Sequence, residues 1–401
     1  MTSALLLEAI HPDAAALLGE SRVGVQALDT ALDPAELVRQ LTDRPVQLLG
    51  IRSKTQLTSE VFDAAPDLLA VGAFCIGTNQ IDLAAASRRG VAVFNAPFSN
   101  TRSVVELAIA EIIALTRGLT DKSAQMHAGV WDKSASGAHE VRGRRLGIVG
   151  YGNIGTQLSV LAEAMGMLVS FFDTADRLAM GNARRCGSLG ELLESADIVS
   201  LHVDGRPENS RMFGADEFAR MRPGSLFMNL SRGFVVDHAA LCQAIRDGHL
   251  AGAAVDVFPA EPKGRGEEFR SELRGLPNVI LTPHIGGSTE EAQQDIGRYV
   301  AAKLRDFLVD GTTTMSVNLP GLVLPLAAGA HRLLHLHHNT PGVLATIDGI
   351  LAEHGVNIAG QLLGTRDAVG YVITDIDVGY PPEVVARLSA MPETLRLRLV
   401  P

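Results

Sequence analysis

Short apolar runs alternate with helical stretches along the first hundred residues. The runs are ALLLEAI from residue 4, VQLLGI at 46–51, LLAVGAF at 68–74 and VAVFN at 91–95. Strands that are buried on both faces have this character. Between the runs, Asp33 and Pro34 predict a helix over 35–41, with Asp as the cap and Pro in the first turn. The pattern predicts repeated βα units.

The alternation restarts more strongly in the middle of the chain. The runs are RLGIVG at 145–150, MLVSFF at 167–172, DIVSLHV at 197–203, SLFMNL at 225–230, AGAAVDVF at 251–258 and NVILTP at 278–283. Helical stretches at 156–165 and 237–246 lie in the gaps. Because βαβ crossovers are right-handed, this series predicts one parallel, doubly wound sheet, a Rossmann-like domain.

A long helix is predicted between the two sets of βα units. The stretch 103–119 has apolar residues with a period near 3.6, at Val104, Leu107, Ala108, Ile112 and Leu115. Such a helix, with one buried stripe, could bridge two domains. After the second set, residues 311–330 contain two prolines, three glycines and no charge, which is typical of a linker that packs along a surface.

The C-terminal segment predicts a third, smaller domain. HRLLHLHH alternates as a half-buried strand would, and TPGVLATIDGILAEHG reads as a helix with Thr340 as N-cap, Pro341 at the first position and Gly355 beyond its end. Two alternating strands, the helix PPEVVARLSAM and the strand LRLRLV follow. The order βαββαβ is ferredoxin-like. The fold class predicted is therefore α/β, with two doubly wound parallel-sheet domains and this small domain.

Charge and cysteine usage exclude several classes of function. The net charge of −10 over 401 residues disfavours binding to nucleic acid or an anionic membrane. Cys75, Cys186 and Cys242 lie far apart without a CxxC pair, so we expect neither disulfides nor a metal site. The N-terminus lacks a basic leader, and no apolar run approaches the roughly 18 residues of a membrane span. We expect a cytoplasmic protein.

A dinucleotide fingerprint follows the first strand of the second set. Its residues are Gly150, Tyr151, Gly152, Asn153, Ile154 and Gly155. Glycines here allow a tight turn, close approach of a pyrophosphate and contact of helix with sheet. Asp173 stands 18 residues beyond Gly155, where a carboxylate can accept both ribose hydroxyls, so NAD is favoured over NADP. Arg177 could offset that charge, and the alternative is a glycine-rich turn beside a solvated aspartate.

Three polar residues follow different strands of this sheet. Arg232 ends LFMNLSR, Glu261 follows AVDVFPAE and His284 follows VILTPH. Ligands bind at the carboxyl ends of parallel strands, so the three could converge on one pocket. Hydride transfer from a secondary alcohol needs a base, a cation for an adjacent carboxylate and an acid that orients the base, which His, Arg and Glu supply. Taken singly, each residue could be a solvated loop side chain.

Several strings resemble those of a known family. They are FCIGTNQIDL, GIVGYGNIGTQL, LSRGFVVD, AGAAVDVFPAEP and LTPHIGGSTEEAQ, which look like the D-3-phosphoglycerate dehydrogenase family of the D-isomer-specific 2-hydroxyacid dehydrogenases. The resemblance runs essentially end to end. It implies that Arg232 anchors the substrate carboxylate, His284 exchanges the proton and Glu261 supports His284. The wider set expected to bind NAD also includes Leu230, Ser231, Asp256, Gly286 and Gly287.

The resemblance also implies the domain organisation and the activity. The substrate domain is then discontinuous, over 1–100 and 287–325, with an NAD domain at 101–286 and a regulatory ACT domain at 330–401. The helix at 103–119 becomes the hinge. The implied reaction is NAD-dependent oxidation of D-3-phosphoglycerate to 3-phosphohydroxypyruvate, the first step of phosphorylated L-serine biosynthesis.

The turn IRSKT could hold the substrate phosphate. A guanidinium, a hydroxyl and a helix N-terminus would meet there, at Arg52, Ser53 and Lys54. By resemblance Arg52 and Ser53, together with Asn100, face the substrate, and Lys54 has weaker support. A solvated polar turn is the alternative.

The C-terminal domain resembles the serine-sensing ACT domains. His337, Asn339 and Asn357 match the effector positions, and such side chains can bind the carboxylate and ammonium of an amino acid across two paired domains. The alternative is a domain kept for assembly alone. One departure is that His331 and Arg332 replace a basic pair expected there. The resemblance further implies a homotetramer, with Trp131 as a candidate subunit contact.

Two rival functions share part of this pattern. A glyoxylate or hydroxypyruvate reductase would carry the same fingerprint and the same Arg, Glu and His, but the ACT-like tail argues against it. An NAD-sensing corepressor-like binding protein would have the same nucleotide domain. The tail and the IRSKT turn disfavour that reading.

Overall fold

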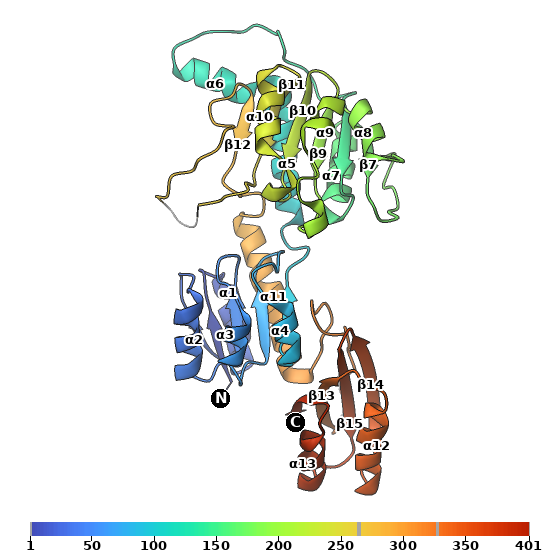
Figure 1. Ribbon diagram of the computed structural model, residues 1–401. Helices are drawn as coiled ribbons and strands as arrows, with labels where there is room; N and C mark the ends of the chain where they lie inside the picture. The colour runs from blue at the N-terminus through green and yellow to red at the C-terminus, as the bar shows by residue number, and fades with distance from the viewer. Residues whose placement is uncertain (1, 263–265, 326–328, 401) are drawn as a thin grey trace. The chain divides into compact units, whose positions relative to one another are not determined.

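The computed structural model describes residues 2–262, 266–325 and 329–400. The chain forms two compact units, one of Met1–Pro97 with Gln293–Pro401 and one of Phe98–Ala292 (Figure 1). Within the described ranges, no helix has both the length and the apolar character needed to cross a bilayer.

The first unit contains a five-stranded parallel sheet in the order β2-β1-β3-β4-β5. Helices α1 and α11 cover one face, and α2, α3 and α4 cover the other. Asp33 caps α2 by accepting from the backbone N–H of Glu36 at 2.9 Å, and Pro34 is its first residue, which confirms that prediction. The elements are β1 (Ser3–Leu6), α1 (Pro12–Glu20), β2 (Gly24–Ala27), α2 (Pro34–Asp43), β3 (Leu48–Ile51), α3 (Ser59–Asp63), β4 (Ala70–Ala73), α4 (Leu83–Arg88), β5 (Ala92–Asn95) and α11 (Glu290–Asp310).

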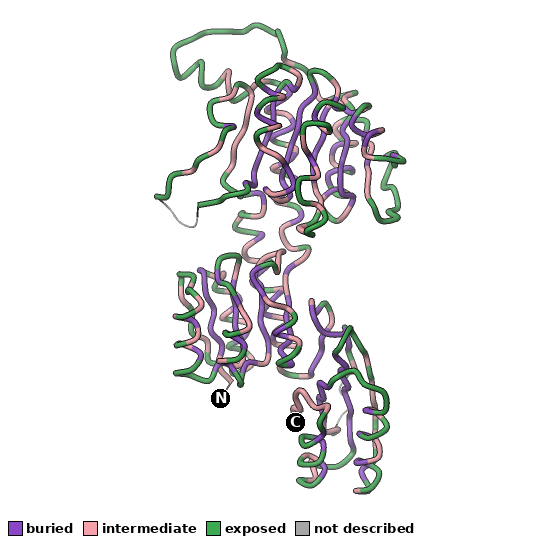
Figure 2. The backbone as a smooth tube through the Cα atoms, viewed as in Figure 1, coloured by how far each residue is buried: buried purple, intermediate pink, exposed green. Residues whose placement is uncertain are grey.

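The second unit contains a seven-stranded parallel sheet in the order β12-β11-β10-β9-β6-β7-β8. Helices α5 and α7 pack on one face, and α8, α9 and α10 pack on the other. Its elements are α5 (Thr101–Arg117), α6 (Leu119–His127), β6 (Arg145–Val149), α7 (Asn153–Ala164), β7 (Leu168–Phe172), β8 (Arg184–Arg185), α8 (Leu189–Ser195), β9 (Ile198–Leu201), η1 (Pro207–Asn209), α9 (Ala215–Arg220), β10 (Ser225–Asn229), η2 (Gly233–Val235), α10 (His238–Arg246), β11 (Leu250–Val255) and β12 (Val279–Leu281). Figure 2 shows its strands buried between helices whose outer faces are exposed.

The C-terminal part of the first unit is an antiparallel sheet in the order β14-β15-β13-β16, which is ferredoxin-like. Both doubly wound sheets and this small domain confirm the predicted fold class. The elements are β13 (His331–His338), α12 (Val343–Glu353), β14 (Ile358–Arg366), β15 (Val369–Ile376), α13 (Pro382–Ala390) and β16 (Thr394–Val400).

Two local predictions in this domain were wrong. Helix α12 begins after Gly342, whose φ of 92° makes it the N-cap, and Thr340 and Pro341 lie before it in a turn. Strand β13 is buried on both faces instead of one. Leu333 packs in the cluster beneath α12 and α13, whereas Leu334 and Leu336 pack with Phe307 of α11 on the opposite face. Residues 326–328 of the predicted linker lie outside the described residues.

Candidate active site

The glycine-rich turn joins β6 to α7 through three glycines with different constraints. Gly150 has a φ of 90°, and a Cβ there would lie 2.7 Å from the backbone of His202. Gly152 is the N-cap of α7 and faces open space. A Cβ on Gly155 would lie 2.3 Å from the carbonyl oxygen of Gly150, so only glycine lets the helix approach the strand. The turn therefore leaves the N-terminus of α7, with Asn153 and Ile154, accessible to an anion.

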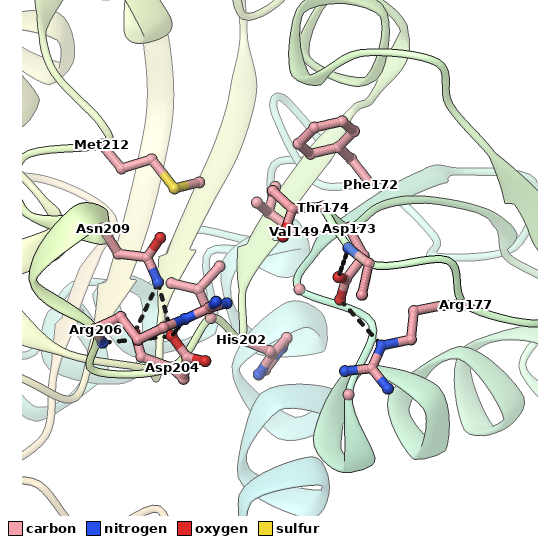
Figure 3. Close-up of a pocket in the computed structure, with 14 residues that line it drawn as sticks. Val149, Phe172, Asp173, Thr174, Arg177, His202, Asp204, Arg206, Asn209 and Met212 are labelled. Atoms are coloured by element: carbon pink, nitrogen blue, oxygen red, sulfur yellow. Dashed lines mark hydrogen bonds and ion pairs between the residues drawn. The ribbon is translucent and has the colours of Figure 1, made fainter. Parts of the chain in front are cut away.

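Asp173 lies beside this turn, directly after β7. Its carboxylate accepts from the backbone N–H of Tyr151 and of Ala175, both at 2.8 Å, and Arg177 Nε lies 3.7 Å away. A pocket of about 590 Å³ opens here (Figure 3). Its opposite wall holds Asp204 and Arg206, which are hydrogen-bonded at 2.9 Å. The pocket combines an acceptor for ribose hydroxyls with two nearby guanidinium groups.

The three residues expected to carry the chemistry lie at the carboxyl ends of the strands. His284 Nδ1 lies 2.9 Å from Glu261 Oε2, and Glu261 Oε1 accepts from the backbone N–H of Phe258 at 3.0 Å. Arg232 is close enough for its charge to act on both groups. Gly233 allows this approach, because a Cβ there would lie 2.0 Å from the carbonyl carbon of Phe258.

Electrostatics favour a charged pair of His284 and Glu261. The hydrogen bond that the imidazole donates to Glu261 raises the pKa of His284, although burial opposes this rise. Burial alone would raise the pKa of Glu261, but its bonds to His284 and Phe258 outweigh that effect and lower it. The imidazole can therefore hold a proton near neutral pH and return it, as a general acid or base must.

Asp256 shapes the loop that presents His284. Its buried carboxylate accepts from the Thr282 hydroxyl at 2.6 Å and from the backbone N–H of Ile285 and Gly286, both at 2.8 Å. His284 itself has a φ of 54°, a strained conformation for a residue with a Cβ.

The neighbouring site residues leave little space for larger side chains. A Cβ on Gly286 would lie 3.0 Å from Asp256 Oδ2, and one on Gly287 would lie 2.2 Å from Asn100 Nδ2. Leu230 and Ser231 are buried after β10, where the Ser231 hydroxyl donates to Asn229 at 2.8 Å. These residues surround the end of the sheet between the glycine-rich turn and His284.

Together these features fit a nicotinamide dinucleotide. The glycine turn admits a pyrophosphate, Asp173 suits the adenosine ribose, and Asp256 with Gly286 lies near His284. Among the described residues no three His, Cys, Asp or Glu side chains are grouped to hold a metal ion.

Arg52 and Ser53 follow β3 in the other unit, and one part of their prediction was wrong. No helix begins at the IRSKT turn, since α3 starts at Ser59. The buried carboxylate of Glu8 instead accepts from the backbone N–H of Lys54 at 3.0 Å and of Thr55 at 2.9 Å. Because Glu8 takes these two donors, the backbone N–H groups of Lys54 and Thr55 are not available to an anion at the turn.

Asn100, predicted to face the substrate, is the N-cap of α5 in the second unit. Its Oδ1 is buried and has no hydrogen-bond partner among the described residues. The structure thus places Asn100 beside Gly287, and Arg52 with Ser53 at the end of β3.

The expected effector residues lie at two ends of the ACT sheet. His337 is buried, donates from Nδ1 to the His338 carbonyl at 2.7 Å, and has a buried Nε2 without a partner in the described chain. Asn339 Nδ2 donates to the Asp367 carbonyl at 3.1 Å. Asn357 is exposed and precedes β14. In the registers with β15, His337 pairs with Gly370, whereas the residue after Asn357 pairs with Ile376.

Arg332, at the start of the ACT domain, is not available to bind an anion. Its guanidinium is fully buried and donates to both carboxylate oxygens of Asp375, at 2.6 and 2.7 Å, and to the carbonyl of Asp310 at 2.9 Å.

Some residues at these sites were missed by the sequence analysis. Asp204 and Arg206 follow β9, so the rule that ligands lie at strand ends could have found them. Glu8 carried no such signal, because its partners are 46 and 47 residues away in the sequence.

Comparison with known proteins identifies two regions of the chain. Residues 109–286 match the NAD-binding domain of the D-isomer specific 2-hydroxyacid dehydrogenases, and residues 333–396 match an AHAS small subunit-like ACT domain. The chain is 49% identical to the D-3-phosphoglycerate dehydrogenase of Escherichia coli K12 over 99% of this chain and 97% of that protein. It is 46% identical to the enzyme of that name from Dictyostelium discoideum, over 99% of this chain and 96% of that one.

Solved structures share the dehydrogenase part of the fold. The D-lactate dehydrogenase of Aquifex aeolicus, complexed with NAD and lactic acid, has a TM-score of 0.67 and 25% identity, and covers 76% of this chain and 95% of its own. An NAD-dependent formate dehydrogenase from Staphylococcus aureus, in complex with NAD, has a TM-score of 0.66 and 26% identity over 77% of this chain and 96% of its own. The chain belongs to the D-isomer-specific 2-hydroxyacid dehydrogenase family, as an NAD-dependent dehydrogenase with a C-terminal ACT domain.

Proposed function

We propose that the chain oxidises D-3-phosphoglycerate to 3-phosphohydroxypyruvate with NAD, the first step of phosphorylated L-serine biosynthesis. The observation that carries the proposal is the 49% identity to a D-3-phosphoglycerate dehydrogenase over almost the whole of both chains. An ACT domain, which a hydroxypyruvate or glyoxylate reductase would not need, supports this choice within the family.

The residues at the strand ends have distinct roles in this reaction. The Arg232 guanidinium binds the substrate carboxylate through its planar fork. His284 accepts the proton of the 2-hydroxyl group, and Glu261 stabilises the imidazolium that results. Bound NAD supplies the acceptor for the hydride that leaves the same carbon. In the reverse direction His284 returns the proton to the ketone oxygen.

The phosphate is bound by the IRSKT turn. Glu8 fixes the backbone of this turn, and Gln80 Nε2 donates to the Arg52 carbonyl at 2.6 Å. The side chains of Arg52, Ser53 and Lys54 then supply the charge-assisted hydrogen bonds for a phosphate dianion. Asn100 completes the substrate set.

The proposal is tested by comparing substrates and a variant. NADH formation is measured with D-3-phosphoglycerate and with D-glycerate, and NADH consumption with hydroxypyruvate and glyoxylate. We expect kcat/KM to be highest with the phosphorylated acid. Arg52→Ala should lower that value by about tenfold or more, since a hydrogen bond to a charged group contributes roughly 1.5–3 kcal/mol, and should leave D-glycerate little affected.

Two results would contradict it. Equal kcat/KM for D-glycerate and D-3-phosphoglycerate would favour a general hydroxyacid dehydrogenase. Absence of turnover with all four compounds, with NADH still bound, would favour an NAD-sensing binding protein.

We further propose that L-serine inhibits the enzyme through the ACT domain and that the chain acts in the cytoplasm as a homotetramer. Support for the effector site is the buried, unpartnered Nε2 of His337 beside Asn339. Support for assembly is Trp131, which is 77% exposed after α6 and suits a subunit contact.

A further inference from the structure

An acidic residue lies within the apolar stripe of α5. Glu111 is four residues from Leu107 and from Leu115 on this helix, and it is only 3% exposed. Val104, two turns earlier on the same face, and the adjacent Ile112 belong to the apolar cluster between α5, α7 and the sheet. Carboxyl groups are almost never buried unless they are paired, so this position needs an explanation.

Few polar groups surround Glu111. Both of its carboxyl oxygens are buried without a partner of good hydrogen-bond geometry in the described chain. The Thr282 hydroxyl, after β12, and the Asp256 carboxylate, after β11, are the polar groups that act on it. Helix α7 and strand β10 contribute apolar side chains, among them Leu158 and Met228.

Asp256 is already bound on its other side. It accepts from Thr282, Ile285 and Gly286, and those bonds hold the segment that presents His284. The α5 face also touches this segment, since a Cβ on Gly286 would lie 3.5 Å from Val104 Cγ2. Thr282 and Asp256, the two polar groups that act on Glu111, therefore also belong to the hydrogen bonds that hold the loop of His284.

The surroundings of Glu111 favour the neutral form of its carboxyl group. Burial, and next the charge of Asp256, raise its pKa to about 8, while the Thr282 hydroxyl opposes this in part. The Asp256 side chain accepts three hydrogen bonds, from Thr282, Ile285 and Gly286. A neutral carboxyl group has one donor, which an ionised one lacks.

We propose that Glu111 is a positioning residue of the nucleotide site, whose buried carboxyl group acts on Thr282 and Asp256 and thereby helps to fix residues 284–286. This inference goes beyond the proposed function and does not depend on which hydroxy acid is oxidised. When Glu111 ionises, a second negative charge is buried beside Asp256, so the arrangement that binds the nicotinamide end is lost.

The test measures NADH binding by nucleotide fluorescence in the full chain between pH 7 and 9.5. If binding requires the neutral form, the Kd of the wild type rises above pH 8 and approaches about tenfold per pH unit. Glu111→Gln keeps an amide donor and cannot ionise, so its Kd should stay near the wild-type value at pH 7 and remain flat. Glu111→Ala should bind NADH several-fold more weakly already at pH 7, because it removes the carboxyl group that acts on Thr282 and Asp256. Glu106→Gln, an exposed site on the same helix that pairs with Arg102, is the matched control and should follow the wild type.

Three results would overturn the proposal. One is an alkaline rise in Kd that persists unchanged in Glu111→Gln. Another is a wild-type Kd that does not change with pH. The third is wild-type NADH affinity in Glu111→Ala. If Glu111→Ala does not fold, the proposal is still tested by comparing the pH dependence of the NADH Kd in Glu111→Gln with that in Glu106→Gln.

Discussion

His284 has a positive φ, and its Nδ1 lies against a carboxylate, while Nε2 is left for chemistry. A strained backbone persists only where surrounding bonds impose it, and here the backbone N–H of His284 donates to the Asp256 carbonyl at 2.8 Å. Arg232, Glu261 and His284 could be predicted as site residues from the sequence, because each follows a predicted strand of the same sheet. The strain and the role of Asp256 could not, because both depend on hydrogen bonds between distant segments.

The pairing of His284 with Glu261 sets the pH dependence of turnover. A raised pKa keeps the imidazole protonated to higher pH, and oxidation needs the neutral base, so kcat for oxidation should rise with pH through that pKa. Glu261→Gln removes the stabilising charge, so the midpoint should move to lower pH. His284→Ala should lose about 100-fold or more in kcat and keep NADH binding. The measurement is kcat against pH in both directions, and an unchanged midpoint in Glu261→Gln would contradict this assignment.

Asp173 is the acid among two guanidinium groups at the ribose end of the pocket. Arg177 lies beside it, and Arg206 on the facing wall is also acted on by its charge (Figure 3). The preference for NAD over NADP therefore depends on a single negative charge, since the cations that a 2′-phosphate needs are already present.

Replacing that charge should relax the cofactor preference. Asp173→Asn keeps an acceptor for the turn, and Asp173→Ala removes it as well. We expect kcat/KM with NADP to rise relative to NAD by about tenfold or more in both variants. The substitution removes the charged acceptor for the ribose hydroxyls of NAD, and it also removes the negative charge that repels the 2′-phosphate of NADP. Adding Arg177→Ala to Asp173→Asn should reverse part of the gain. A constant ratio of the two kcat/KM values would show that Asp173 does not read the ribose.

Element boundaries follow the sequence where a local signal controls them. Asp33 caps α2 as predicted, and Asp237, the first residue of the predicted helical stretch 237–246, is found to be the N-cap of α10. The Thr340–Pro341 signal failed because the chain makes a turn first and Gly342 takes the left-handed conformation at the cap. The alternation in strand β13 predicts one buried face, but its second face is also covered, by α11 and the segment after it. The sequence of the eight strand residues does not reveal this packing partner.

Long-range polar pairs mark the limit of prediction between elements. Arg332 and Asp375 lie on the neighbouring strands β13 and β15, yet they are 43 residues apart in sequence. Glu111 did carry a signal, an acid at a position that the helical period assigns to the buried face. Removing one partner of a buried ion pair typically lowers the free energy of unfolding by about 3–5 kcal/mol. Such pairs therefore hold elements together, although the hydrophobic pattern of the sequence does not reveal them.

At the scale of the whole molecule, the positions of the proposed effector residues favour a site that is shared between the ACT domains of two chains. His337 and Asn357 lie at opposite ends of the registers with β15, between Gly370 and Ile376. Six residues of strand separate those ends by roughly 20 Å, too far for one small amino acid to bridge. Strand β14 lies at an edge of the sheet, so a second ACT domain can pair there and bring Asn357 of one chain to His337 of the other.

This arrangement predicts complementation between inactive effector sites. L-serine should lower turnover of the wild type with D-3-phosphoglycerate saturating, and Asn339→Ala or Asn357→Ala alone should raise the half-inhibitory concentration by about fivefold or more, because a coupling of about 1–3 kcal/mol is lost. When a chain with Asn339→Ala and a chain with Asn357→Ala are co-expressed, serine inhibition should return. In each mixed pair of ACT domains, one of the two shared sites then has both asparagines intact. His338→Ala, an exposed neighbour, is the control and should respond as the wild type does. A wild type insensitive to millimolar serine would end the regulatory proposal and leave the catalytic one intact, whereas mixed oligomers as insensitive as the single variants would show that the site is not shared between chains.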